Sequence, residues 1–380
     1  MSRTGVISEY LFASIDKKLN ELKTRGVDVI SFGVGDPDSP PPLALRQKIA
    51  ELVLAEENHN YSPYIGTLPF REAASRYMER RYGVKMAPAS EVVGLIGSKE
   101  GIGNCYIAYT TEGDINLVPS LAYPIPKTMT TLMGGTPHIL STPASRGFLM
   151  DTDEVDPAVA KKATLLYVNY PNNPTGTAVP SAFYEKTLEF ALANDIIIVA
   201  DAAYEEIYFQ EKPRSFFEWP EAKRCVIEFH SLSKMFNITG WRLAFALGSP
   251  ELLKPMNIMK TNMDSGQFKP IQYAGAFALD TLVDDFGPAQ RQTYRSRMKK
   301  LQAALESLGA KAPLPGGTFF LWGKTPQGMD SSAFTEFLLE KYGIFVTPGN
   351  MFGPEGEGYF RASLTVTDER LDQAVARILK

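Results

Sequence analysis

The sequence has few cysteines, few histidines and no long apolar run. Its two cysteines, Cys105 and Cys225, are far apart and form no C-x-x-C pair. This argues against a disulfide scaffold or a cysteine-based zinc site, and it favours a reducing compartment. The three histidines, His59, His138 and His230, share no metal-ligand spacing, so we expect no metal.

Two further absences concern membranes and nucleic acids. No apolar stretch approaches the roughly 18 residues of a membrane-spanning helix, and the opening "MSRTGVISEYLF" lacks the apolar core of a signal peptide. The 39 lysines and arginines are balanced by 43 aspartates and glutamates, which gives a formal net charge of −4. We therefore expect a cytoplasmic protein that binds neither a membrane nor a nucleic acid.

The remaining composition is that of a globular protein. Hydrophobic residues make up 44% of the 380 residues and charged residues 22%. A chain of this length can bury a large core. It corresponds to two or three domains, or to one large α/β domain with an appendage.

The middle of the chain alternates helical patterns with short apolar runs. Segments such as "SAFYEKTLEFALAN" are helical, and the runs show little period-2 alternation, as expected for strands buried on both faces of a parallel sheet. The runs are "EVVGLIG", "DINLVPS", "TLLYVNY", "DIIIVAD", "CVIEFHS" and "RLAFALG". This β-α-β order predicts an α/β fold with a doubly wound, mostly parallel sheet.

The two ends of the chain differ from this middle part. Near the N-terminus, an amphipathic pattern from Leu11 to Gly26 predicts a helix, and "VDVISFGVGDPDSPPP" predicts a short strand and a loop. From about residue 285, a long charged helix precedes "GGTFFLWGK", "GIFVTPG" and "YFRASLT", which predict the strands of a smaller α+β domain. We predict an N-terminal arm with part of the small domain at 1–40, a large domain at 41–284 and a small domain at 285–380.

Polar residues follow several of the predicted strands. Because ligands of open α/β sheets bind at the carboxyl ends of the strands, these residues are site candidates, although each one alone is compatible with a turn or a helix cap. They are Asn172 and Asn173, Asp201 and Tyr204, Ser231, Ser233 and Lys234, and Gly97, Ser98 and Lys99 at a predicted helix start.

The candidates match the chemical groups of one cofactor. A helix N-terminus with Ser98, Ser231 and Arg242 suits a phosphate, and Asp201 suits a cationic ring nitrogen. Such a buried charge pair is worth roughly 5 kcal/mol before desolvation.

The other groups of this cofactor also have candidates. Asn173 and Tyr204 can hydrogen-bond a ring oxygen, and Lys234 can form an imine with an aldehyde. Together the groups describe pyridoxal 5′-phosphate. Burial beside positive charge should lower the pKa of Lys234, which keeps part of its amine neutral.

Competing motifs are weaker. "GIGNCY" does not satisfy G-x-G-x-x-G, and the chain has neither a Walker A motif nor a G-x-S-x-G elbow. We interpret His230, next to "SLSK", as a packed strand-end residue rather than a catalyst.

The ordered motifs "NNPTG", "DAAYEEI", "SLSKMFNITGWR" and "YFRASLT" resemble those of fold-type I pyridoxal-phosphate aminotransferases of class I/II, over essentially the whole chain. The resemblance implies a seven-stranded sheet between helices, amino-acid and 2-oxo-acid substrates, and a homodimer with shared active sites. It assigns Lys234 to the imine, Asp201 to the ring nitrogen, Asn173 and Tyr204 to the ring hydroxyl, Ser98, Lys99, Ser231 and Arg242 to the phosphate, Tyr123 to ring stacking, Tyr61 to the neighbouring subunit's phosphate, and Arg361 with Gly35 to the substrate carboxylate.

Three long segments are similar to LL-diaminopimelate aminotransferases and their succinyl-diaminopimelate relatives. Those proteins often carry a glutamate where this chain has Tyr64 and Ile65, which leaves aspartate, alanine, aromatic and methionine substrates open. Two other functions remain as alternatives: a carbon–sulfur lyase with the same lysine, and a ligand-sensing regulator. The acidic chain, which opens directly on the predicted N-terminal helix, speaks against the regulator.

Overall fold

A computed structural model describes residues 5, 19, 21, 22 and 24–380 of the chain. The predicted helix from Leu11 to Gly26 lies largely outside these residues. The helices are α2 (Leu43–Leu54), α3 (Leu68–Tyr82), α4 (Ser98–Tyr109), α5 (Ile125–Leu132), α6 (Pro157–Ala160), α7 (Ser181–Asn194), α8 (Leu232–Met235), α9 (Pro250–Met263), α10 (Lys269–Thr281), α11 (Val283–Ser307), α12 (Ser331–Tyr342) and α13 (Asp368–Leu379).

In the described part of the chain, the strands form three sheets, the largest of which has seven strands in the order β2-β8-β7-β6-β5-β3-β4. Strand β8 runs antiparallel to both of its neighbours, and the other pairs are parallel. Its strands are β2 (Val92–Leu95), β3 (Ile115–Pro119), β4 (Thr136–Leu140), β5 (Ala163–Val168), β6 (Ile197–Asp201), β7 (Val226–Ser231) and β8 (Ala244–Leu247).

The six apolar runs predicted as strands all lie in this sheet. Residues on β2, β7 and β8 are buried throughout, because helices cover both faces of the sheet. Strand β4 was not predicted, since it lies at the sheet edge and its sequence "TPHIL" is only partly buried. The mostly parallel seven-stranded sheet is confirmed.

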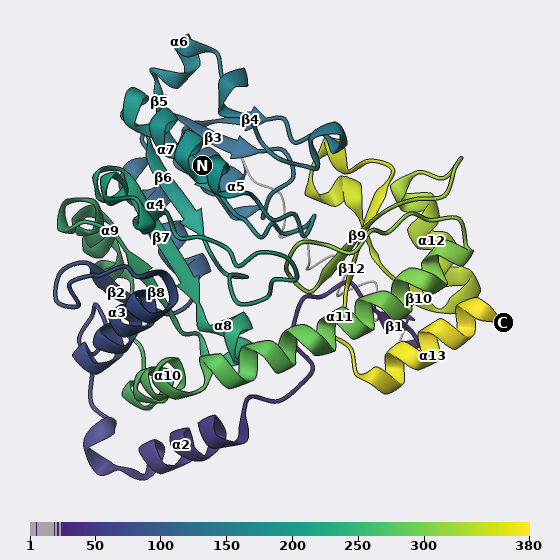
Figure 1. The fold of residues 1–380 in the computed structure, drawn as a ribbon, viewed down its shortest axis with the longest axis horizontal. Coiled ribbons are helices and arrows are strands. Elements are labelled where there is room, and N and C mark those ends of the chain that lie inside the picture. Colours follow the sequence, from purple (N-terminus) through teal and green to yellow (C-terminus); the bar gives the residue numbers. More distant parts are fainter. Residues whose placement is uncertain (1–4, 6–18, 20, 23) are drawn as a thin grey trace.

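Alternate side chains of the strands enter two cores. On β7, Val226 packs in the core formed with α3, α7 and α10, whereas Ile227 and Phe229 pack in the core formed with α4 and α9. This alternation follows from the period of two residues along a strand. The sheet is therefore the middle of three layers (Figure 1).

A smaller α+β part adjoins the carboxyl edge of the sheet. Its antiparallel sheet has the order β11-β12-β9, and β1 pairs in parallel with β10. Its own core packs side chains of α11, α12 and α13 against these strands. The strands are β1 (Ile30–Ser31), β9 (Phe320–Lys324), β10 (Ile344–Phe345), β11 (Thr347–Pro348) and β12 (Tyr359–Ser363).

Helix α11 connects the two parts. It begins beside α10, next to the large sheet, and runs on to α13 in the smaller part (Figure 1). Residue 285, the predicted start of the small domain, lies inside this continuous helix. The three-part division at 1–40, 41–284 and 285–380 stays a prediction.

Candidate active site

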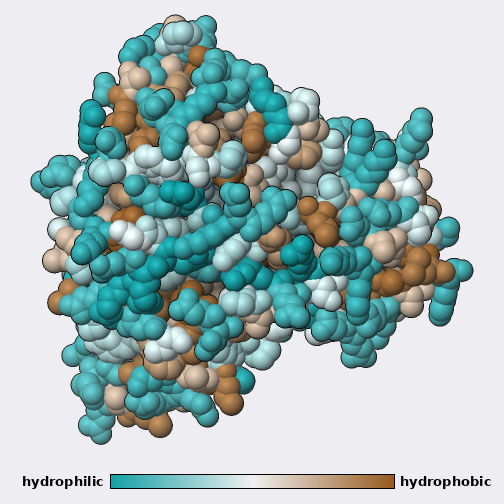
Figure 2. All heavy atoms as spheres, in the orientation of Figure 1, coloured by the Kyte–Doolittle hydropathy of each residue, from teal (hydrophilic) through white to brown (hydrophobic). Residues whose placement is uncertain are grey.

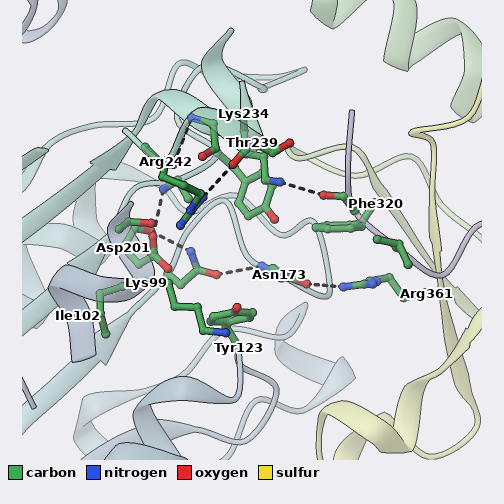
Figure 3. A pocket seen from close by; sticks show the side chains of 18 residues that line it. Lys99, Ile102, Tyr123, Asn173, Asp201, Lys234, Thr239, Arg242, Phe320 and Arg361 are labelled. Carbon is green, nitrogen blue, oxygen red and sulfur yellow. Dashed lines mark hydrogen bonds between the residues drawn. The ribbon is translucent and has the colours of Figure 1, made fainter. Parts of the chain in front are cut away.

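A cavity of about 360 Å³ lies where the carboxyl ends of the strands face the smaller part (Figure 3). Of the twelve residues to which the family resemblance assigns a role, eleven line it: Gly35, Ser98, Lys99, Tyr123, Asn173, Asp201, Tyr204, Ser231, Lys234, Arg242 and Arg361. The twelfth, Tyr61, does not line it, and its side chain is exposed. The fold thus gathers residues from both parts of the chain around one space.

Lys234 occupies the short helix α8 directly after β7. Ser231 caps this helix by accepting a hydrogen bond from the backbone N–H of Ser233, which turns the chain so that Lys234 faces the cavity. Burial lowers the pKa of the Lys234 amine to about 8, and the positive charges of Arg242 and Arg361 add to this, whereas Asp36 opposes it. The expected lowering of this pKa is confirmed.

Asp201 ends β6 and is buried. Its Oδ2 accepts a hydrogen bond of 2.8 Å from the hydroxyl of Tyr167, and its Oδ1 accepts one of 3.3 Å from the backbone N–H of Ala203. Burial nevertheless raises the pKa of this carboxyl to about 6, although both hydrogen bonds and the charge of His230 lower it. A cation placed beside Asp201 would favour its ionised form.

The start of helix α4 also lines the cavity (Figure 3). Ser98 and Lys99 open this helix, whose free N–H groups favour an anion. Arg242 packs closely against Gly97, where an added Cβ would lie only 2.1 Å from a guanidinium nitrogen. Gly97 has a φ of +113°, so only glycine fits this position without strain.

Hydrogen bonds fix both the side chain and the backbone of Arg242. Its Nη1 donates to the carbonyl of Thr239 at 3.0 Å, and the side-chain amide of Gln267 donates to the carbonyls of Trp241 and Arg242. The loop after α8 therefore presents the guanidinium to the start of α4.

Arg361 reaches the cavity from β12 and is 1% exposed. One guanidinium nitrogen donates to Asn173 Oδ1 at 2.9 Å and another to the carbonyl of Gly33 at 2.6 Å. The guanidinium also lies over the ring of Phe320, 4.2 Å from its centroid. These contacts fix the plane of the group, so that its fork can meet a carboxylate.

Two residues of the site, Asn169 and Tyr167, were not expected from the sequence. Asn169 donates to the carbonyl of Asp201 and accepts from the backbone of Asn173, which joins two neighbouring strand ends. It directly follows β5, so the strand-end rule could have found it. Tyr167 gave no such signal, because it lies within an apolar run and reaches Asp201 only through the pairing of β5 with β6.

The cavity fits pyridoxal 5′-phosphate. It offers an amine of lowered pKa for an aldehyde, a buried carboxylate for a ring nitrogen, and a helix start with Arg242 for a phosphate. The absence of a Cβ at Gly97 leaves room for the guanidinium there. Within residues 24–380 and the four described residues before them, no cluster of potential metal ligands occurs, and no helix is long and apolar enough to cross a membrane.

Comparison with known families agrees with this geometry. The model of the family described as aminotransferase class I and II matches residues 27–378. The chain belongs to this family. Its members are pyridoxal-phosphate enzymes of fold type I, so the protein is a PLP-dependent aminotransferase.

Individual relatives cover nearly the whole chain. An LL-diaminopimelate aminotransferase of Aquifex aeolicus is 45% identical over 99% of this chain and 97% of its own length. Substrate-bound BacF of Bacillus subtilis has a TM-score of 0.92 at 33% identity, covering 98% of this chain and 94% of that one. A probable N-succinyldiaminopimelate aminotransferase of Thermus thermophilus has a TM-score of 0.90 at 33% identity, covering 97% and 99%.

Proposed function

We propose that the enzyme transfers an amino group between LL-diaminopimelate and 2-oxoglutarate, in either direction, as a step of lysine biosynthesis. The observation that carries the transfer chemistry is the meeting of Lys234, Asp201 and Arg361 in one cavity. The choice of substrate is supported by the relatives named LL-diaminopimelate aminotransferase, at 43–45% identity over nearly the full chain.

The cofactor, when bound, supplies an aldehyde that condenses with amines and a ring that accepts the electron pair of a broken Cα–H bond. In our proposal, Lys234 provides the amine that anchors it. The same amine, once displaced by substrate, would take the proton from the substrate Cα and deliver it to the carbon that carried the cofactor's aldehyde oxygen, which is the proton shift that amino transfer requires. Its lowered pKa suits this exchange, because a proton carrier works best with a pKa near the working pH.

The residues around Lys234 divide the remaining tasks. Asp201 would hold a positive charge on the ring nitrogen. Tyr167 donates to its carboxylate, and Asn169 donates to its backbone carbonyl, so both fix its position. Asn173 and Tyr204 bind the ring hydroxyl, and Tyr123 stacks on the ring.

At the phosphate, Ser98, Lys99, Ser231 and Arg242 supply donors and positive charge. They line the same cavity as Lys234.

Arg361 binds the α-carboxylate of the substrate, and Gly35 and Asn173 border it. The guanidinium donates to the carbonyl of Gly33 and to Asn173 and is almost fully buried, so its donors are pre-positioned in a space with little water. A charge-assisted pair in such a space binds more strongly than in water.

The proposed substrate also has charged groups at the end that is far from Arg361. A second carboxylate and an ammonium group need partners there, because buried unpaired charges are costly. Asn262, Ser265, Gln267 and the hydroxyls of Tyr10 and Tyr64 could offer neutral hydrogen bonds there, from either subunit. Gln267 donates to the carbonyls of Trp241 and Arg242, and Asn262 donates to that of Ile258, so these amide nitrogens are engaged. We therefore expect Ser265, Tyr64 and ordered water to be the donors for the second carboxylate; Tyr10 lies outside the described residues.

A donor panel tests the substrate. With 2-oxoglutarate as acceptor, kcat/KM is compared for LL-diaminopimelate, its meso isomer, aspartate, alanine, methionine, phenylalanine and N-succinyl-diaminopimelate. We expect the highest value for LL-diaminopimelate. A single-carboxylate donor that is tenfold better would overturn the diaminopimelate proposal. Measuring both keto-acid products and free ammonia separates transfer from carbon–sulfur elimination, which releases ammonia.

We also propose that the active unit is a homodimer with shared sites. Tyr61 is 86% exposed and does not line the cavity of its own chain. Other exposed apolar side chains lie within seven residues of it in sequence, at the end of α9 and just before α10: Leu54, Tyr64, Leu68, Met263 and Phe268. A second copy covering them would bury apolar area and bring Tyr61 to the neighbour's phosphate site.

The surface shown in Figure 2 and the two cysteines bear on where the protein is located. Hydrophilic residues predominate on the face shown in Figure 2, with separate hydrophobic ones between them. Cys105 and Cys225 are both free and buried. We propose a cytoplasmic location, in which thiols stay reduced.

A further inference from the structure

His230 is a buried histidine held between two buried glutamates. It lies on β7, directly before Ser231, and is 0% exposed. Its Nε2 is 2.8 Å from Glu228 Oε1, and its Nδ1 is 2.7 Å from Glu205 Oε2. The ring stacks on Phe245 at a centroid distance of 4.7 Å. His230 is packed, as predicted, but it also carries two ion-pair contacts that a packing residue does not need.

The groups around this histidine come from several elements. From α3, Tyr77 donates to Glu206 and Tyr82 donates to Glu205, each at 2.7 Å. Arg81, also on α3, pairs with Glu206 at 2.6 Å. Glu228 accepts hydrogen bonds from Ser215 and the backbone of Phe216. In the described part of the chain, His230 is the cation paired with both Glu205 and Glu228.

This arrangement keeps the histidine charged. Burial by itself lowers the pKa of His230, but the two glutamates outweigh this and raise it to about 10. One oxygen of Glu205 is buried without a hydrogen-bond partner in the described structure. The charge of Glu205 is therefore compensated mainly by His230, and a neutral residue there would leave two buried carboxylates together.

The histidine is connected to the cofactor site through the chain itself. Glu205 directly follows Tyr204 and comes four residues after Asp201, and its backbone N–H closes the turn on Ala202. Asp201 pairs across the strands with Phe229, so the next residue, His230, lies on the opposite face of the sheet. His230 thus contacts the turn after β6 through Glu205, on the side of the sheet opposite to the side chain of Asp201.

We propose that His230 is a positioning residue of the cofactor site: as an imidazolium held by Glu205 and Glu228, it fixes the turn that carries Asp201 and Tyr204 and places a positive charge behind Asp201. The inference rests on the role proposed above for Asp201. It is a role exerted through Asp201 and Glu205, since His230 does not line the cavity.

The test compares two ligands that differ only at the ring nitrogen. Cofactor-free protein is reconstituted with pyridoxal phosphate or with its 1-deaza analogue, in which a C–H replaces that nitrogen, and both dissociation constants are measured. In His230→Gln, we expect binding of pyridoxal phosphate to weaken at least about tenfold and binding of the analogue less than about threefold. The double variant His230→Gln/Glu228→Gln, which restores the net charge of the cluster, should recover part of the selectivity.

Three results would decide against the inference or its basis. Equal weakening for both ligands means that His230 supports only the fold, and it overturns the inference. Loss of selectivity in Asp201→Ala but not in His230→Gln also overturns it, while leaving the role of Asp201 intact. Unchanged selectivity in Asp201→Ala overturns the proposed role of Asp201 itself.

A measurement without any substitution covers the case in which the variants do not fold. The chain has three histidines, so isotope-labelled imidazoles give few NMR signals. In the holoenzyme, we expect the His230 ring to stay doubly protonated from pH 6 to pH 9, while His59 and His138 serve as internal references. A neutral His230 ring at pH 7 would overturn the proposal.

Discussion

The amine of Lys234 donates a hydrogen bond of 2.9 Å to the carbonyl oxygen of Gly35, across 199 residues of sequence. Gly35 belongs to the loop after β1, which pairs with β10 in the smaller part. The contact therefore joins the reactive amine to the part of the chain that carries Arg361. Burial at this junction of the two parts is the main reason that the pKa of Lys234 is lowered.

The lowered pKa predicts how fast the cofactor-free protein captures pyridoxal phosphate at different pH. An amine with a pKa of about 8 loses its proton at lower pH than the ordinary lysine value of 10.5. The neutral, reactive fraction should thus rise about tenfold from pH 7 to pH 9 and then level off. Stopped-flow absorbance measures this rate, and a rate still rising steeply above pH 9.5 would contradict the lowered pKa.

Asp36 offers a matched control for the same measurement. Its charge raises the pKa of Lys234, and it also accepts a hydrogen bond from Thr239. In Asp36→Asn, we expect the midpoint of the capture profile to move to lower pH. A midpoint moved upward would show that another group controls the amine.

Asp201→Ala should reduce kcat/KM by at least about 100-fold, because the ring nitrogen loses its counter-charge in a buried site. Tyr167→Phe removes one hydrogen bond to the same carboxylate, so a smaller loss of about tenfold is expected. Steady-state kinetics on both variants give the comparison. If Asp201→Ala stays within threefold of wild type, the residue only caps the strand end.

Arg361→Lys keeps the charge but loses the planar fork and the packing over Phe320. We expect kcat/KM for amino acids to fall about 100-fold, the effect of losing a charge-assisted bidentate contact. The informative measurement is the ratio of rates for alanine and alaninamide, which lacks the carboxylate. That ratio should shrink in the variant; an unchanged ratio would place the carboxylate elsewhere.

Gly97→Ala should weaken cofactor binding at least about tenfold, since the new Cβ would collide with the Arg242 guanidinium and the backbone φ is positive. Gly103, on the same helix α4, has open space around it. Gly103→Ala should therefore leave cofactor binding unchanged and stabilise the helix by about 0.5–1 kcal/mol. Equal effects of the two substitutions on cofactor affinity would show that Gly97 has no particular role at the phosphate.

Mixing two inactive variants tests the shared sites. In a heterodimer of Lys234→Ala and Tyr61→Ala chains, one site contains both lesions and the other contains neither, provided that Tyr61 acts across the interface. Activity should then return to about half of the wild-type value per heterodimer. No recovery after verified subunit exchange would place Tyr61 in its own subunit's site or outside any site.

The large sheet and most of the candidate site residues follow from local patterns in the sequence. Apolar runs this short, without alternation and flanked by turn residues, favour strands covered on both faces, and all six lie in the seven-stranded sheet. Because parallel strands bring their carboxyl ends to one edge, the sequence also predicts that Asn173, Asp201 and Lys234 lie close together, as they do in the cavity. Strand β4 was not predicted, because a partly exposed strand at the sheet edge needs no continuous apolar run.

Which groups surround these residues depends on the folded chain. Tyr167, which donates to Asp201, lies on β5, and Glu205, which contacts His230, lies in the turn after β6. No local pattern in the sequence records these two pairings between neighbouring strands. The return of the N-terminal segment through β1, which brings Gly35 to Lys234, is also a long-range contact. The pKa values of Lys234 and Asp201 depend on burial by these distant segments, and burial is a property of the folded chain, which local sequence cannot specify.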